Sequence, residues 1–462
     1  MSNLRKAVSL SATKASGIQI NLLDALEILH IHITEVLCDR VFQSVRNRER
    51  QRKWSLFVLA RFWMTVILHA PSSLTQRLEE VKLGKNVLVP WVDSSFVAFF
   101  KKCKATHHRF FKALYQAFTE KVAAKAPAVY VPQTHALLKR FSGIWAIDGS
   151  RLDEIAHRCK VLWNEAAVVL PGSLLVVYDL VRGISRHVLF DPDAAKSEMI
   201  RAESLLDGIP INTLILGDRL YASIRFFREL TERQLWGLFR LNHRLKVKKD
   251  HLIRRRQGGG RTIIEEWLVT VGCGQGQASI RLRLILFRQG KIRRELLSNV
   301  LDPHALSAKE ALELYPLRWR IERMFFDLKE VLHLNSFYAA NANAVAMQVY
   351  ATAMVHTAFR IAQAKIAQKN GISPEILSSA KLFSYLAVAS IGWIGGELYY
   401  DDMVRINRNS ALIKPNWKNS SFAHTSLLSV LMHVRNPERR ALPPRTPMRW
   451  KSLAHIKGLK LS

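Results

Sequence analysis

The stretch YPLRWRIERMFFDLK, residues 315–329, combines a hydrophobic helical face with a row of polar side chains. At about 100° per α-helical residue, Arg318, Glu322 and Lys329 fall within about 40° of one another. Apolar side chains fill the neighbouring sector, as in a helix that packs on a core: Leu314, Leu317, Ile321, Met324, Phe325, Leu328 and Leu332. Pro316 suits a first helical turn, so Tyr315 is expected where the helix begins. The pattern places a carboxylate between cations at the edge of a core.

The spacing Y-x2-R-x3-E-x6-K resembles the signature of DDE transposases of insertion-sequence family 4. Tyr315, Arg318, Glu322 and Lys329 match its four positions. The resemblance implies that Glu322 is the third catalytic carboxylate and that the other three residues hold phosphates at the transposon end. Taken without the rest of the chain, the same residues also fit a solvated basic helix beside the core.

Two aspartates follow short apolar segments that read as strands. Asp148 comes directly after residues 144–147, and Asp218 comes after residues 213–216 and one glycine. Strand patterns at 174–180 and 184–190 and a helical pattern at 193–206 lie between them, and a helix at 223–230 and a strand at 235–241 follow. Either aspartate alone also fits a turn residue. With Glu322, however, they follow the element order of a ribonuclease H-like core.

Three carboxylates from two strand ends and a helix would form an oxygen-ligand site suited to Mg²⁺ or Mn²⁺. Two such ions can activate the attacking oxygen and stabilise the leaving one during displacement at phosphorus. We therefore expect Asp148, Asp218 and Glu322 to be both the catalytic residues and the ligands of two ions. The resemblance implies cleavage of transposon-end inverted-repeat DNA, transfer of the 3′ ends to target DNA, and a homodimer in the DNA complex.

Residues 242–302 are expected to form a β subdomain inserted in the catalytic core, because 262–271 is rich in β-branched residues and apolar positions alternate at 280–286. Three glycines, 258–260, predict a mobile basic loop between its strands. Its expected DNA contacts are Arg254, Arg255, Arg256 and Arg261. In relatives an insertion tryptophan stacks on a flipped base, which makes Trp267 the candidate for that role here; the alternative is a core position.

Helical patterns flank this core. The expected domains are a helical, DNA-binding region at 1–140, a core at 141–241 and 303–370 with the insertion at 242–302, and a helical C-terminal region with a basic tail at 371–462. The fold class is thus α/β plus helical domains. A basic cluster at 46–53 is either a solvated linker or a phosphate contact, the latter through Arg48, Arg50 and Arg52.

Composition agrees with a nucleic-acid partner. Lys and Arg number 69 against 37 Asp and Glu among 462 residues, and the excess is spread along most of the chain. A membrane partner is not expected, because no basic amphipathic helix has a matching apolar insertion face. The four cysteines form no C-x-x-C pair, which argues against a zinc site and a disulfide framework. Together with the lack of a signal-peptide pattern, this favours a reducing cytoplasm. The family resemblance implies that the cytoplasm is bacterial and that the protein works at the nucleoid.

Two other functions fit parts of the sequence. A stand-alone ribonuclease H-like nuclease would use the same acids, but it would not account for Tyr315, Arg318 and Lys329 or for the added helices. A non-catalytic DNA-binding protein derived from a transposase would not need all three acids. Both alternatives share the expected core and differ in what happens to the DNA.

Overall fold

The computed structural model describes residues 23–45, 53–82, 88–90, 92, 94–131, 134–152, 172–194, 196–258, 262–272, 279–339, 341–394 and 397–398. The chain forms two compact units. We call Ala126–Arg151 with Gly172–Phe326 the sheet unit, and Met1–Lys125, Leu152–Pro171 and Asp327–Ser462 the helical unit. This division differs from the four regions expected from the sequence, because the helix at 342–369 packs with N-terminal helices.

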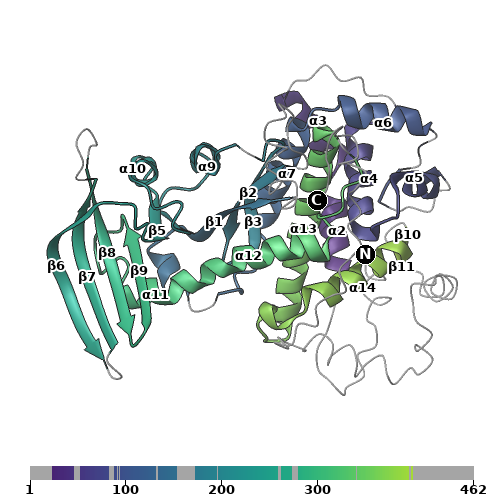
Figure 1. Cartoon of the computed structure of the whole chain (residues 1–462). Coiled ribbons are helices and arrows are strands. Elements are labelled where there is room, and N and C mark those ends of the chain that lie inside the picture. Colours follow the sequence, from purple (N-terminus) through teal and green to yellow (C-terminus); the bar gives the residue numbers. More distant parts are fainter. Residues whose placement is uncertain are drawn as a thin grey trace, which may run out of the picture. The chain divides into compact units, whose positions relative to one another are not determined.

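The sheet unit is organised around a nine-stranded sheet (Figure 1), with strand order β3-β2-β1-β4-β5-β9-β8-β7-β6 among the described residues. The strands are β1 (Gly143–Arg151), β2 (Ser173–Asp179), β3 (Ile184–Asp191), β4 (Thr213–Gly217), β5 (Trp236–Arg240), β6 (Val247–Gly258), β7 (Thr262–Val271), β8 (Ile280–Gln289) and β9 (Ile292–Ser298). β1, β4 and β5 are parallel neighbours, whereas β2, β3 and β6 to β9 pair antiparallel.

Alternation along β1 assigns its side chains to two faces of the sheet. Trp145 and Ile147 enter the hydrophobic core beneath α9 (Glu198–Leu206) and α10 (Ile224–Glu232). Ala146 and Asp148 therefore face the other side, where η4 (Tyr315–Arg318) and α12 (Trp319–Phe326) run. The short helix α11 (Ala308–Leu314) precedes η4, and a further turn is η2 (Leu137–Lys139).

Local signals set several of these boundaries. The expected capping box is confirmed: the Ser307 hydroxyl accepts from the backbone N–H of Glu310, and the Glu310 carboxylate accepts from the backbone N–H of Ser307. The hairpin between β2 and β3 turns at Gly183, whose φ of 68° lies in the left-handed region that suits glycine. Ser223 caps the start of α10.

The expected insertion is β-structure, but it is continuous with the core sheet. β9 hydrogen bonds to β5, so β6 to β9 extend the sheet that holds β1 and β4. The expected mobile loop is also corrected. Arg254, Arg255 and Arg256 lie within β6, because its pairing with β7 continues to the Gly258–Thr262 pair.

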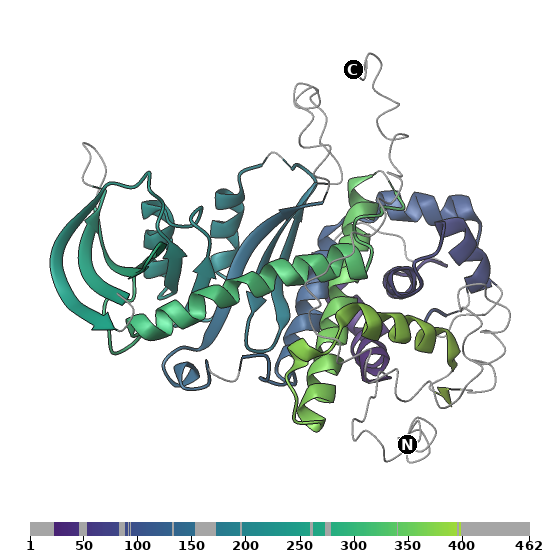
Figure 2. The same cartoon turned by 60° about the horizontal axis from the view of Figure 1, so that its bottom comes forward.

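The helical unit has one long central helix, α13 (Ala342–Lys369), which α2, α4, α6 and α7 contact. Its small and apolar side chains are buried along nearly its whole length, as expected for a helix inside a core. The other elements are α2 (Leu23–His32), α3 (Glu35–Val45), α4 (Leu56–His69), α5 (Leu74–Lys82), α6 (Phe96–Ala105), α7 (Arg109–Ala123), η5 (Asp327–Val331), η6 (Pro374–Ile376), α14 (Ser379–Gly392), β10 (Trp393–Ile394) and β11 (Glu397–Leu398). Figure 2 shows the same elements from a second direction.

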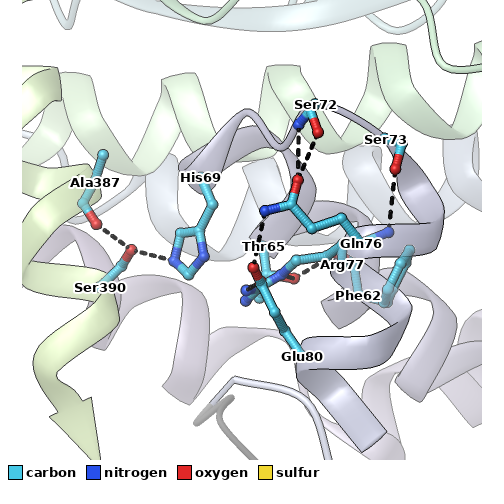
Figure 3. Close-up of polar contacts among 10 residues, drawn as sticks. All are labelled: Phe62, Thr65, His69, Ser72, Ser73, Gln76, Arg77, Glu80, Ala387 and Ser390. Carbon is cyan, nitrogen blue, oxygen red and sulfur yellow. Dashed lines mark hydrogen bonds and ion pairs between the residues drawn. The ribbon is translucent and has the colours of Figure 1, made fainter. Parts of the chain in front are cut away.

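Buried polar contacts join helices of this unit (Figure 3). Arg77 of α5 is ion-paired with Glu80 and donates from Nε to the Thr65 hydroxyl of α4 at 3.4 Å. His69 of α4 contacts the Ser390 hydroxyl of α14 at 2.7 Å, and burial lowers the pKa of His69 to about 3. The imidazole is therefore neutral at physiological pH, and the contact is an ordinary hydrogen bond.

Within the described residues, no single helix has the length and hydropathy of a membrane span. The pair α4 and α5 meets these criteria only when taken together, and it is bent by 116°. Cys38 and Cys103 are free and buried, whereas Cys159 and Cys273 lie outside the described residues.

Candidate active site

Two of the expected catalytic acids come from the neighbouring strands β1 and β4. The parallel pairing of β1 with β4 ends at the pair Ala146 and Leu216. Asp148 and Asp218 each follow two residues later, so neighbouring strands present them at the same level. Asp148 lies inside β1 and not beyond its end, because β1 continues to Arg151 against β2. Asp218 directly follows β4, as expected.

Arg318 connects the first acid with the third. Its Nη1 donates to Oδ2 of Asp148 at 3.0 Å, and its Nη2 donates to Oε1 of Glu322 at 2.8 Å. The Arg318 side chain is 9% exposed, against 18% for the side chain of Asp148 and 37% for that of Glu322. Because the cation is more buried than either carboxylate, this bridge is shielded from solvent more than a surface ion pair is.

Carboxylates outnumber the cations among the side chains that act on Asp148. Burial raises the pKa of Asp148 to about 7; Arg318 opposes this shift, and the charges of Glu198 and Asp218 add to it. Burial lowers the pKa of Arg318, but Asp148 and Glu322 outweigh burial and raise it. The Asp148 carboxylate is thus ionised near neutral pH only with help from the adjacent guanidinium.

Glu198 is a fourth acid at this site that the sequence analysis missed. The Tyr221 hydroxyl donates to its Oε1 at 2.5 Å, and a Cβ atom at Gly149 would clash with its Oε2. A larger residue after Asp148 would have to displace this carboxylate, which comes from α9 on the other face of β1. The sequence therefore gives one signal for a side chain packed beside Asp148, which is Gly149, but it does not show that this side chain is Glu198.

Asp218 and Tyr315 are the remaining candidate site residues that lie in the sheet unit. Asp218 Oδ1 accepts from the backbone N–H of Leu220 at 2.7 Å, so one carboxylate oxygen also serves as a turn acceptor. Burial raises the pKa of the Tyr315 hydroxyl, and the nearby charge of Asp218 raises it further while Arg318 lowers it. Tyr315 thus lies close to both the second acid and the bridging cation.

The expected uninterrupted α-helix over 315–329 is corrected. Residues Tyr315–Arg318 form a 3₁₀ turn, Trp319–Phe326 an α-helix and Asp327–Val331 a π-helical turn. These segments advance by different angles per residue, so a single helical wheel does not apply across them. Lys329 lies in the π turn, in the helical unit, whereas Tyr315, Arg318 and Glu322 are in the sheet unit.

The candidate DNA contacts on the insertion lie on the edge strand β6 and its neighbour β7. Arg255 and Arg256 are exposed and Arg254 is half-buried. Trp267 is half-buried against the sheet core, its indole N–H donates to Glu265 at 3.1 Å, and Lys249 Nζ lies 4.5 Å from its ring centroid. Arg48, Arg50, Arg52 and Arg261 fall outside the described residues. DNA contact stays a prediction for all of these residues.

Carboxylate oxygens have the chemistry that Mg²⁺ or Mn²⁺ needs, but their placement here does not fit such an ion. Among the described residues, no three His, Cys, Asp or Glu side chains converge closely enough to hold one metal. Arg318 instead contacts two of the three expected ligands. Metal binding by Asp148, Asp218 and Glu322 therefore stays a prediction.

Comparisons with known proteins agree on a class of protein. Residues 172–358 match the family model described as "Transposase DDE domain". Over 212 residues the chain is 26% identical to the "Putative transposase y4zB" of Sinorhizobium fredii, covering 43% of this chain and 57% of that relative. These matches support a transposase with a DDE domain. The chain spans little more than half the length of the curated relative.

A solved structure is also similar in part. The piggyBac transposase, in its synaptic complex with hairpin DNA, aligns over 94% of this chain and 89% of its own, at 10% identity and a TM-score of 0.36. A likeness at this level carries no argument about the fold or the activity of the chain.

Proposed function

We propose that this protein is a DDE transposase that cleaves DNA at transposon ends and transfers the 3′ ends to target DNA. The observation that carries the proposal is the arrangement of Asp148 in β1 and Asp218 directly after the neighbouring parallel strand β4, with Glu322 linked to Asp148 through Arg318. The match to a transposase DDE domain supports it. Assignment to insertion-sequence family 4 rests on the spacing of Tyr315, Arg318, Glu322 and Lys329.

We infer a ribonuclease H-like core for the catalytic part. The strand order β3-β2-β1-β4-β5, with β2 antiparallel to β1 and with β1, β4 and β5 parallel, supports this assignment. The helices α9 and α10 on one face and α12 on the other agree with it. Such a sheet presents acids from separate segments of the chain at one place.

The chemistry proposed is phosphoryl transfer between DNA strands. The resemblance predicts a divalent-metal requirement, Mg²⁺ or Mn²⁺ with two ions, and the arrangement of the side chains with Arg318 between the acids does not itself supply that site. What the chain's own residues offer is a buried guanidinium beside the acids, a group that pairs well with phosphate. Arg318 would hold a phosphate near Asp148.

The partners proposed are transposon-end inverted-repeat DNA and target DNA, bound by a homodimer. The net charge of +32 supports a polyanionic partner. Exposed Arg255 and Arg256 on the edge strand β6 add cations to the sheet unit. We also propose that the protein acts in a bacterial cytoplasm, at the nucleoid.

The test is transposition in cells, from a donor plasmid that holds the gene's own flanking DNA around a marker. Asp148→Asn, Asp218→Asn and Glu322→Gln should each lower marker transfer by about a thousandfold or more, because each acid is expected to act on the transition state. Glu313→Gln is the control, since Glu313 is an exposed acid of α11 that pairs only weakly with Lys309, at 3.9 Å. Normal transfer by the three site variants would refute the proposal, and cleavage without joining would favour a nuclease.

A further inference from the structure

The turn that contains Lys329 is π-helical. The backbone N–H of Leu332 donates to the carbonyl oxygen of Asp327 at 2.9 Å, which is one residue farther along the chain than in an α-helix. Asp327 begins this turn and is buried, whereas Lys329 is half-buried and Glu330 is exposed. Because π turns are rare, we expect contacts from outside the turn to hold this one in place.

The side chain of Asp327 provides such contacts. It is 2% exposed and reaches two helices of the helical unit. The Ser379 hydroxyl of α14 donates to its Oδ2 at 3.1 Å. From α13, His356 Nε2 lies 3.8 Å and Arg360 Nη1 lies 3.9 Å from the same oxygen. Arg360 supplies the positive charge that a buried carboxylate needs. Asp327 therefore fixes the start of the π turn to both helices, while its carbonyl group closes the turn.

We propose that Asp327 is a positioning residue for Lys329, because its buried side chain holds the π turn from which this lysine binds a DNA phosphate. The inference rests on the proposed function, in which Lys329 contacts the transposon end. Asp327 is buried and acts only through the lysine. Without its anchor the segment would be free to take up α geometry. The angle per residue would then change, and Lys329 would rotate about the helix axis.

The sign of the expected effect separates positioning from general electrostatics. DNA is a polyanion, so removing a carboxylate from a protein normally strengthens binding. Removing Asp327 should instead weaken binding, because the phosphate contact of Lys329 is lost. The surrounding core can tolerate the change. Arg360 also donates to Glu375 at 3.2 Å, so the buried cation keeps a carboxylate partner when Asp327 is replaced.

The experiment measures the affinity of the full-length protein for a duplex of the terminal sequence that flanks the gene, over a range of salt concentrations. Lys329→Ala and Asp327→Ala should each lower the affinity about fivefold to tenfold in about 0.1 M salt, and each should reduce the slope of log affinity against log salt by about one. The double variant should bind no more weakly than Lys329→Ala alone, because Asp327 acts only through Lys329.

Glu330→Gln is the matched control. It removes an exposed acid of the same turn, so it should bind the duplex as tightly as the unmodified protein or slightly more tightly. Asp327→Asn keeps an acceptor for the Ser379 hydroxyl, and its affinity should lie between those of the unmodified protein and Asp327→Ala. Ser379→Ala removes the donor from α14 without changing the net charge, and it should weaken binding by a smaller factor, again only when Lys329 is present.

Thermal unfolding checks that each variant is folded, and Asp327→Asn with Ser379→Ala decides the matter if Asp327→Ala is not. The inference is overturned if the deciding variants bind DNA as tightly as the unmodified protein or more tightly. It is also overturned if they weaken binding equally with and without Lys329, since the role of Asp327 would then be structural.

Failure of the inference differs from failure of the proposed function. If Lys329→Ala leaves the affinity and the salt slope unchanged, Lys329 binds no phosphate and the inference is wrong, although transposition by the unmodified protein would still support the function. A protein that never transposes, but in which Asp327 and Lys329 are coupled in DNA binding, refutes the transposase reaction and not the positioning of Lys329.

Discussion

The hydroxyl group of Tyr221 donates a hydrogen bond to Oε1 of Glu198 at 2.5 Å, next to the backbone of Gly149. Tyr221 is fully buried in the core under α9 and α10, so this bond fixes the Glu198 carboxylate from inside the protein. The acid is therefore held beside Asp148 by the packing of the sheet unit and not by solvent-exposed contacts.

Tyr221→Phe should lower the free energy of unfolding by about 1.5 to 3 kcal/mol, because a charged acceptor loses a buried donor while the ring is kept. Glu198→Gln retains an acceptor oxygen at the same position and should lower it by less. Urea unfolding followed by tryptophan fluorescence measures both. Equal stability of Tyr221→Phe and the unmodified protein would show that the bond contributes little.

Asp148→Asn should make the stability of the protein less dependent on pH. The pKa of Asp148 is about 7 in the folded protein against an ordinary value of 3.8, so the folded state binds more protons between these values and loses stability as pH rises from about 4 to about 7. Asparagine does not titrate. The variant should therefore gain stability relative to the unmodified protein at pH 8, on the order of 2 to 4 kcal/mol, and gain clearly less at pH 5, where only part of the loss has occurred.

Thermal unfolding at pH 5, 6, 7 and 8 provides the measurement. Glu313→Gln, which removes an exposed carboxyl group, is the control and should leave the pH dependence as it is. A difference between Asp148→Asn and the unmodified protein that is constant from pH 5 to 8 would mean that Asp148 has an ordinary pKa.

Arg283→Met should destabilise the protein by about 3 to 5 kcal/mol. The guanidinium of Arg283 is fully buried, binds Glu266 at 2.5 Å and donates to the carbonyl oxygen of Leu306 at 2.6 Å. Methionine fills similar volume but leaves the Glu266 carboxylate buried without a counter-charge. Arg283→Met combined with Glu266→Leu should recover much of the loss, and chemical unfolding of both variants tests this. Additive destabilisation in the double variant would contradict the pairing.

Trp267→Ala is expected to separate two steps of DNA cleavage. If Trp267 traps a base flipped out near the cut end, the variant should nick the first strand normally and complete the double-strand break more slowly. Its packing against the sheet core also predicts a loss of stability, so Trp267→Phe, which keeps an apolar ring, is the matched variant. Normal rates for both steps in folded Trp267→Ala would assign the indole to structure alone.

The parts of the fold that the sequence predicts well are those set by short-range patterns. Apolar segments ending near Asp148 and Asp218 became β1 and β4, and the Ser307 and Glu310 spacing became a capping box. The β-branched run at 262–271 is β7. Each depends on neighbours within a few residues, which a single sequence displays directly.

What the sequence did not predict depends on tertiary contacts. Glu198 approaches Asp148 because Gly149 lacks a side chain and Tyr221 supplies a hydroxyl, and these three residues come from separate elements. Alternation along β8 would put Arg283 on a polar face, yet Glu266 of β7 makes a buried position stable for it. The change from 3₁₀ to α to π geometry over 315–331 likewise follows from packing, which a uniform helical period does not capture.

The hydrogen bonds between β5 and β9 determine whether residues 242–302 can be deleted without harm to the rest of the sheet. β4, which precedes Asp218, pairs with β5, and β5 in turn pairs with the last strand of residues 242–302. Deleting those residues would leave the backbone of β5 as an open edge, ready to pair with another chain. An inserted segment that hydrogen bonds to the strands of the active site can therefore no longer be deleted without exposing one of those strands. Amide exchange in β5 should slow or quicken together with that in β9.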